Sequence, residues 1–421
     1  MKKLVGVIIS IFVILAVLLL GYKFVYKISP RLFINKDTKL IYANEGITTK
    51  DFKELSQFIA NKEKRKKFEK NIKTLNKYIT KIYAFSDDDI QRLKENDIVF
   101  VIDPGYFYPF ALKELDKYYE SYRDGILIEK ENVSGYFLPE NKKTYLKPHR
   151  GLFIVGFKPE VIKKFVSKED QYTYYKDIEN SIDENRDNLL GTLIYTGPEI
   201  EEFGVKFTTL TGNVVKNKLK FQQVTVLNEN SVGRYKNTKE NRELLQYVGK
   251  NDIYLSLDDF SNLDVLIFNP YVLGYNFDKE SMFEFWKAIF GIDIKLMLKE
   301  VDGEVIIRST ENGAGAMVKI KEDSKEIRKV LGLLQSENGF LDMSNEIQIK
   351  DNNTVILGTN EFKKQEKEYN IPKEAFIFGD MDFSKFLNLP DLDITFIGNG
   401  NKITTDIEMS ADTVKEIQKR Y

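Results

Sequence analysis

Residues 393–409 read DITFIGNGNKITTDIEM, in which two stretches of apolar and polar residues flank the turn residues Gly398-Asn399-Gly400-Asn401. Alternation places apolar side chains on one face of a β-strand, and Gly and Asn tolerate the positive φ of a tight turn. This stretch therefore predicts an antiparallel hairpin. Two further hairpins are expected, Lys295–Val301 with Glu304–Ser309 around Asp302-Gly303, and Phe207–Leu210 with Lys218–Val226 around Thr211-Gly212-Asn213.

Amphipathic helices are expected between the hairpins. Apolar residues recur at three- and four-residue spacing, as on one face of a helix, in residues 51–82, Glu160–Phe165, Ser281–Phe290 and Ser324–Leu334. Hairpins with interspersed helices predict the α+β class with antiparallel sheets, rather than a doubly wound nucleotide-binding fold. The basic run 61–67 either attracts anionic lipid headgroups or forms a solvated helix face. Its interleaved glutamate and the lysine-rich composition of the whole chain favour the solvated face.

An apolar run near the start of the sequence predicts a transmembrane helix. Leu4–Tyr22 contains one polar residue, Ser10. A helix of that length spans roughly 28 Å, about the hydrocarbon thickness of a bilayer. The alternative is a cleaved signal peptide, but no small-x-small cleavage site follows the run. We expect an uncleaved anchor with its interfacial residues over 1–27, and a linker over 28–36.

The charges that flank this run decide its expected orientation. Lys2 and Lys3 precede it and Lys23 and Lys27 follow it, so the positive-inside rule is nearly balanced. A short basic head is the ordinary form of a signal-anchor. We therefore expect a single-pass protein of the cell membrane with the bulk of the chain extracytoplasmic, and aromatic residues such as Tyr26 at the membrane interface.

Composition excludes several classes of function. The chain has 421 residues, 42% apolar and 30% charged, which suits two or three globular domains. Lys+Arg 63 against Asp+Glu 64 leaves a net charge of −1, without the basic excess of a nucleic-acid binder. Cysteine is absent and histidine occurs once, which excludes disulfides, thiolate metal sites and multi-histidine metal sites. We expect no cofactor, no metal and no nucleic-acid partner.

Short segments recur in the same order along the chain. Asn96–Asp103 resembles Asn251–Asp258, Phe153–Lys158 resembles Val355–Asn360, and Leu193–Tyr195 resembles Phe376–Phe378. The shared order, more than any single match, indicates an internal repeat. It predicts two related α+β lobes, 37–247 with a helical insertion and 248–421. Lys39–Ala43 would open the first lobe.

This layout resembles a class of bacterial membrane-anchored envelope proteins of unknown function, which have a duplicated β-rich extracytoplasmic region. The resemblance is carried by short stretches: Asn96–Asp103, Asn251–Asp258, Gly291-Ile292-Asp293 and Val301–Ile306. It implies a place in the cell envelope, and it carries over no catalytic residues.

Few patterns in the sequence point to catalysis. His149 lies in a turn between Pro148 and Gly151 and lacks the Gly-x-Ser-x-Gly elbow that accompanies many catalytic triads. Asp103 and Asp258 end two of the similar segments and could act as an acid–base pair in glycoside cleavage. Aspartates that merely terminate strands are far commoner, so the balance is against an enzyme and no catalytic residue is assigned.

Aromatic clusters are the candidate ligand-binding residues. Tyr106, Phe107, Tyr108 and Phe110 follow Pro104-Gly105, so we expect them in a loop or helix start as an exposed contact. Trp286 is the other candidate, although core packing is the favoured explanation for Met282–Trp286.

Three functions follow from these observations. The first is a non-enzymatic binding or scaffolding protein that recognises another envelope protein. The second is a carrier of lipid or another apolar ligand, with an apolar groove lined by residues such as Phe107, Phe110 and Trp286. The third and weakest is a hydrolase of envelope polymers that uses Asp103 and Asp258.

Overall fold

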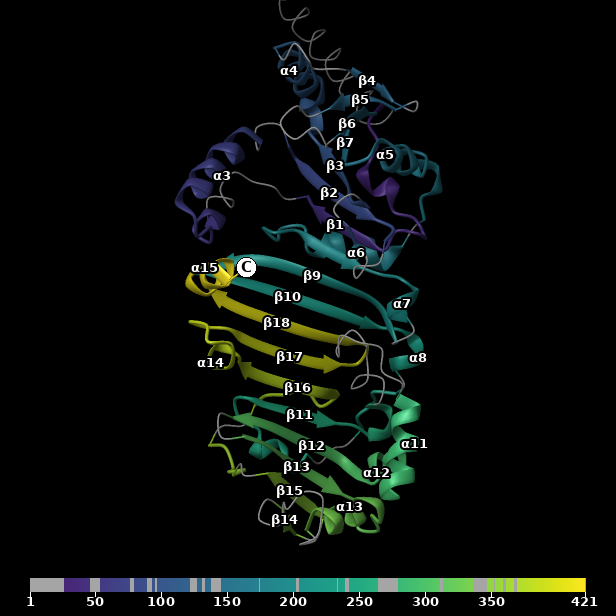
Figure 1. Cartoon of the computed structure of the whole chain (residues 1–421), viewed down its shortest axis with the longest axis vertical. Helices are drawn as coiled ribbons and strands as arrows, with labels where there is room; N and C mark the ends of the chain where they lie inside the picture. The colour runs from purple at the N-terminus through teal and green to yellow at the C-terminus, as the bar shows by residue number, and fades with distance from the viewer. Residues whose placement is uncertain are drawn as a thin grey trace, which may run out of the picture. The chain divides into compact units, whose positions relative to one another are not determined.

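The structure is a computed structural model of the whole chain, and it is described here over most of its length (Figure 1). The described residues are 26–45, 54–75, 79–88, 93–94, 97–121, 127–130, 133–137, 145–173, 175–201, 204–232, 234–238, 242–263, 279–310, 313–335, 347–351, 353–358, 361–366 and 369–420. They divide into two compact units, the first comprising residues up to Gly197 with Thr209–Asn217, and the second comprising Pro198–Thr208 with Lys218–Tyr421.

The first unit contains an antiparallel sheet. Its strands pair in the order β8 (Thr192–Tyr195), β1 (Leu40–Asn44), β2 (Lys81–Ser86), β3 (Val99–Asp103), β7 (Leu152–Gly156), β6 (Tyr145–His149), β5 (Val133–Phe137) and β4 (Leu127–Lys130). Its helices are η2 (Pro30–Phe33), α3 (Lys62–Leu75), η4 (Gly105–Phe107), α4 (Tyr108–Ser121), α5 (Pro159–Val166), η5 (Glu169–Gln171) and α6 (Lys176–Glu184).

The second unit is also built on an antiparallel sheet. Its strands pair in the order β10 (Lys218–Leu227), β18 (Lys402–Ser410), β17 (Asp393–Asn399), β16 (Ala375–Asp382), β11 (Asp252–Ser256), β12 (Val301–Thr310), β13 (Gly313–Ile320), β15 (Thr354–Gly358) and β14 (Ile347–Lys350). Its helices are α7 (Pro198–Glu201), α8 (Glu229–Val232), η6 (Leu245–Tyr247), η7 (Phe260–Leu263), α11 (Lys279–Phe290), α12 (Ile294–Lys299), α13 (Glu326–Gln335), α14 (Ser384–Leu387) and α15 (Ala411–Arg420). The predicted α+β class with antiparallel sheets is confirmed.

The same pairing order occurs in both units. β1 lies between β2 and β8 just as β11 lies between β12 and β16, and β3 pairs with β7 as β13 pairs with β15. Two of the matched sequence segments fall on strands with equivalent places, β7 with β15 and β8 with β16. The third match, of Asn96–Asp103 to Asn251–Asp258, relates β3 to β11, and these two strands have different positions in the pairing order. The strand at the position equivalent to β11 is β1.

The strand β9 (Val205–Val215) pairs with β10, and its residues are divided between the two compact units. The predicted lobes, 37–247 and 248–421, place both strands in the first lobe, whereas β10 belongs to the second unit. Residues 28–36, expected as a linker, include Ile28, Phe33 and Ile34, whose side chains are buried in the first unit. The lobe boundary itself stays a prediction.

Two of the three predicted hairpins are present. β17 and β18 join at Gly400-Asn401, with Gly400 at φ +58°. β9 and β10 join at Lys216-Asn217, both at positive φ, rather than at Thr211–Asn213, which lie within β9. A two-residue turn with both φ values positive matches the twist of the flanking strands, so the chain turns later than the glycine suggests.

The hairpin predicted at Lys295–Ser309 is wrong in its first half. Residues 294–299 form α12, because the Asp293 side chain accepts a hydrogen bond from the Leu296 N–H (3.1 Å) and so caps the helix. The turn expected at Asp302-Gly303 lies instead inside β12, where the register with β13 shifts between Val301 and Val305. Gly303, at φ +77°, supplies the backbone conformation of this irregularity.

The predicted helices are largely present. Helices α5, α11 and α13 cover the expected segments to within a few residues. Of the helix expected over 51–82, the described part is helical at 54–56 and over α3, whereas Lys81–Ser86 form β2 between β1 and β3. The basic run at the start of α3 is largely exposed, as a solvated helix face.

The predicted transmembrane helix, Leu4–Tyr22, lies outside the described residues. Among the residues that the structure describes, no helix has both the length and the apolar character needed to cross a membrane.

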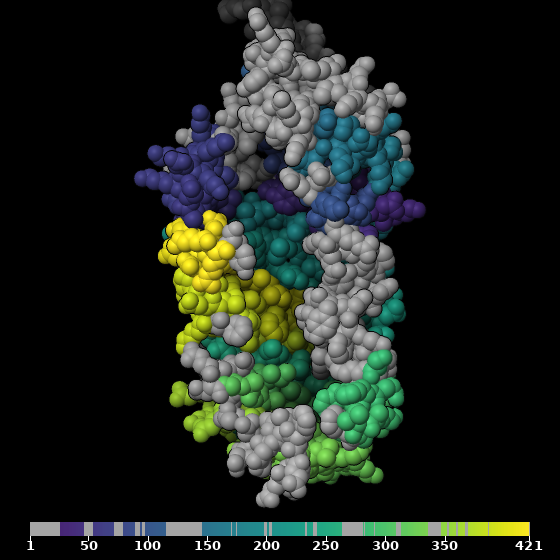
Figure 2. Space-filling model, viewed as in Figure 1, coloured from purple at the N-terminus to yellow at the C-terminus, as the bar shows by residue number. Residues whose placement is uncertain are grey.

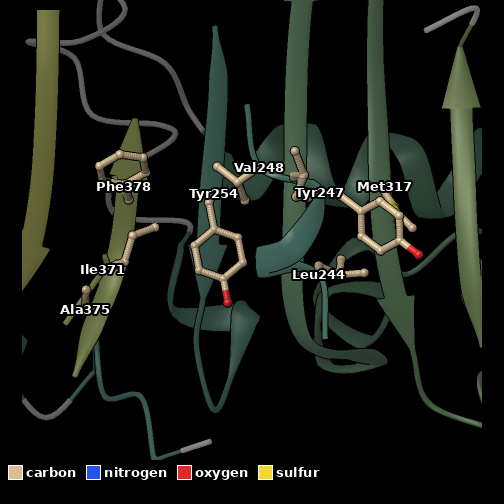
Figure 3. Packing of buried hydrophobic residues seen from close by; sticks show 9 residues of the cluster. Leu244, Tyr247, Val248, Tyr254, Met317, Ile371, Ala375 and Phe378 are labelled. Carbon is tan, nitrogen blue, oxygen red and sulfur yellow. The ribbon is translucent and has the colours of Figure 1, made fainter. Parts of the chain in front are cut away.

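Apolar side chains on the sheet faces form the cores. In the second unit, one buried cluster includes Tyr254 from β11, Met317 from β13 and Phe378 from β16, together with Tyr247 and Val248 from the segment before β11 (Figure 3). Another contains Leu255 from β11, Val305 from β12 and Phe376 from β16. Both faces of this part of the sheet are therefore covered, which explains why its strands contain apolar residues at successive positions.

Candidate functional site

The junction between β3 and α4 presents the aromatic residues singled out from the sequence. Asp103 ends β3 with a buried carboxylate whose Oδ1 accepts a hydrogen bond from the Gly105 N–H (2.7 Å). Its backbone carbonyl accepts hydrogen bonds from both the N–H and the hydroxyl of Thr80 (2.8 Å each). Gly105 adopts φ +62°, and a Cβ there would lie 3.1 Å from Thr80 Cγ2. Glycine and aspartate thus turn the chain sharply into η4.

This turn directs neighbouring aromatic side chains to opposite sides. Tyr106, Phe107 and Phe110 are exposed, at 52%, 50% and 65% of their surface, and we call these three residues the η4/α4 surface. Tyr108 is 5% exposed and packs on Phe153, with ring centroids 5.1 Å apart. The exposed position expected for this stretch therefore holds for three residues, whereas Tyr108 belongs to the core because the turn rotates it inward.

The first described residues of the chain are attached to this junction. The Tyr26 ring lies 6.4 Å from the Tyr108 ring, centroid to centroid. Lys27 Nζ lies 2.8 Å from Asp103 Oδ1, and the Ile28 N–H donates to the Arg150 carbonyl (3.2 Å). Three successive residues are thus held on the first unit beside the η4/α4 surface.

A second apolar surface lies on α11 in the second unit. Phe285, Trp286 and Ile289 are exposed, and we call them the α11 surface, whereas Phe283 on another side of the helix is buried. Figure 2 shows α11 in green at the surface of the molecule. Core packing, the favoured explanation for Met282–Trp286, therefore applies to Phe283 and not to Trp286.

A charged cluster surrounds the buried Glu45 carboxylate in the first unit, and no sequence pattern predicted it. The Glu45 carboxylate accepts hydrogen bonds from the Tyr83 hydroxyl and from Arg31 (3.0 Å), and it lies 3.0 Å from Lys81 Nζ. Arg31 also donates to Asp183 on α6 (2.6 Å). Burial alone raises the pKa of Glu45, but the Tyr83 hydrogen bond and the nearby cations outweigh burial and lower it. The cluster joins η2, β2 and α6.

The candidate catalytic groups all have structural partners. Asp258 accepts hydrogen bonds from the N–H and hydroxyl of Thr238 (2.8 and 3.0 Å), while Asp103 is held by Gly105 and Lys27. The two aspartates belong to different units. His149 Nε2 lies 2.7 Å from Glu169 Oε2 at the β6–β7 turn. Within the described residues, no group of three acidic or histidine side chains is arranged as a metal site.

Comparison with known proteins gives remote structural likenesses. No protein-family model matches the sequence, and no curated protein matches it. Among solved structures, the chain is similar to TP0453 in crystal form III, with 14% identity and a TM-score of 0.32, over 48% of this chain and 81% of TP0453. Crystal form IV matches with 13% identity and a TM-score of 0.32, over 49% and 83%. A TM-score of this size assigns neither fold nor function, so the case for function rests on the residues described above.

Proposed function

We propose that this chain is a membrane-anchored, extracytoplasmic binding or scaffolding protein of the bacterial cell envelope, without catalytic activity. The observation that carries the proposal is the α11 surface, where Phe285, Trp286 and Ile289 are exposed on one helix. Adjacent exposed apolar side chains of this size are typical of interaction sites, and aromatic residues are enriched at the centres of protein interfaces. The apolar run Leu4–Tyr22 supports the membrane anchor.

Helical geometry confines the proposed contact to one side of α11. At about 100° per residue, Phe285, Trp286 and Ile289 lie within one apolar stripe, and Glu284 faces away from it. A protein partner would bury this stripe and leave Glu284 in water. The hydrolase alternative has no comparable support, because Asp103 and Asp258 each have structural hydrogen bonds.

In-cell photocrosslinking tests this proposal. A photoreactive amino acid replaces Phe285 or Ile289 in the full chain, and the matched control carries it at Glu284, which is also exposed. We expect the same protein to crosslink from positions 285 and 289 and not from 284, because only the stripe would be in contact. Failure to obtain a protein product from the stripe would contradict scaffolding. Crosslinks to lipid from the stripe would instead support the carrier alternative.

A further inference from the structure

The position of Tyr26 brings the η4/α4 surface close to the predicted anchor. Leu4–Tyr22 ends four positions before Tyr26 in the sequence. Four residues of fully extended chain reach at most about 14 Å. Tyr26 packs against Tyr108 and Lys27 pairs with Asp103, so a chain segment of at most that length connects the predicted anchor to residues held at the β3–α4 junction.

The η4/α4 surface has the chemistry of a membrane-interface contact. Tyr106, Phe107 and Phe110 are large aromatic side chains on the exposed side of a helix start, and Lys113 and Glu114 on the next turn are also exposed. Tyrosine favours the headgroup region of a bilayer, where its apolar ring and its polar hydroxyl are both accommodated, and exposed phenylalanines of an interfacial helix lie at the boundary between headgroups and acyl chains.

We infer that Tyr106, Phe107 and Phe110 lie in the headgroup region of the bilayer that holds Leu4–Tyr22, so that the first unit rests on the membrane at the β3–α4 junction. This inference depends on the membrane anchoring proposed above. These side chains contact lipid rather than a partner protein, because the adjacent anchor holds this surface close to the bilayer. The ion pair between Lys27 and Asp103 makes the connection short and fixed, so residues 26–28 do not act as a free tether.

Single-cysteine labelling tests this inference, and the absence of cysteine from the chain makes each label unique. Phe107→Cys and Phe110→Cys are made in the full chain, labelled with a polarity-sensitive fluorophore and reconstituted in phosphatidylethanolamine–phosphatidylglycerol vesicles. Asp88→Cys is the matched control. It is exposed in the same unit, beyond the Ser86 end of β2, while Lys81 at the other end pairs with Asp103. Those two ends are roughly 17 Å apart. Val13→Cys reports on the anchor.

The inference predicts two changes in quenching. Aqueous iodide should quench the labels at positions 107 and 110 several-fold less than the label at 88, and nitroxide-bearing phospholipid should quench the first two and not the third. Equal iodide quenching at 107, 110 and 88 would overturn the inference. If the label at Val13 is then shielded from iodide, the anchor is in the membrane and only the inference about the η4/α4 surface is wrong. If iodide also quenches the label at Val13, the proposed membrane anchoring is wrong as well.

A third pattern would also overturn the inference. Labels at 107 and 110 that are shielded from iodide but untouched by nitroxide lipid would place these side chains against protein, such as a second copy of the chain. An unchanged far-UV circular dichroism spectrum of each variant checks that the first unit, which carries the substitutions, remains folded.

Discussion

Glu300 shows how a single carboxylate begins a helix. Its oxygens accept hydrogen bonds from the N–H groups of Lys325, Glu326 and Ile327 (2.8, 3.0 and 2.8 Å), which are the residue before α13 and its first two residues. Helix N-terminal N–H groups lack partners within the helix, and the helix dipole favours a negative charge beside them. Burial alone raises the pKa of Glu300, but these three hydrogen bonds outweigh burial and lower the pKa below its ordinary value of 4.5.

A lowered pKa in the folded state gives α13 a predictable pH dependence. The ordinary pKa of a glutamate is 4.5, and above this pH the ionised Glu300 carboxylate stabilises α13 in full. This contribution is lost as the pH falls through the lower pKa that Glu300 has in the folded state. Glu300→Gln should weaken α13 by about 1 kcal/mol at neutral pH and remove this dependence. Hydrogen exchange of the α13 amides measures both effects. The exposed Glu322→Gln is the control, and equal protection in the two variants would contradict the capping role.

At the scale of elements, a buried ion pair joins two neighbouring strands. Asp252 on β11 and Arg308 on β12 are directly opposite in register. Arg308 donates to both carboxylate oxygens (2.7 and 2.6 Å) and to the Tyr247 carbonyl (3.0 Å), and Asp252 is fully buried. The paired geometry fixes the register of β11 against β12, since a shift of one residue would leave a charge buried without its partner.

Arg308→Met should destabilise the second unit by about 3–5 kcal/mol, because it leaves the Asp252 carboxylate buried without its cation. Adding Asp252→Asn to that variant should recover part of the loss. Urea unfolding followed by the fluorescence of Trp286, the one tryptophan of the chain, measures both. Lys250→Ala, which removes an exposed ion pair with Asp393, should cost less than about 1 kcal/mol. Similar losses for Arg308→Met and Lys250→Ala would show that burial does not matter.

At the scale of the whole molecule, the expected orientation places both units outside the cytoplasm. Asp88→Cys should therefore react with a membrane-impermeant maleimide added to spheroplasts, because Asp88 is exposed in the first unit. Lys2→Cys, on the expected cytoplasmic side, should react only after the membrane is permeabilised. The reverse pattern would establish the opposite orientation and would remove the extracytoplasmic part of the proposed function.

Local sequence patterns predicted several elements correctly, and the predictions that failed did so because of single neighbouring residues. The hairpin at Gly400-Asn401 and helices α5, α11 and α13 follow from alternation, turn residues and three- to four-residue spacing. The strand predicted at Lys295–Val301 is wrong because Asp293 caps a helix there. The turn predicted at Asp302-Gly303 is wrong because Gly303 bends a strand instead of ending one. The exposed position predicted for Tyr108 is wrong because the turn at Gly105 directs its side chain away from its exposed neighbours.

The sequence by itself determined the α+β class, the helices with one apolar face and the exposed aromatic start of α4, because these depend on residues within a few positions of one another. Only the tertiary structure decided the order of strands in each sheet and the partners of the buried charges. Lys27 with Asp103, Lys81 with Glu45 and Asp252 with Arg308 are far apart along the chain. Such pairs form only when folding brings their strands and helices together, so no local sequence pattern predicts them.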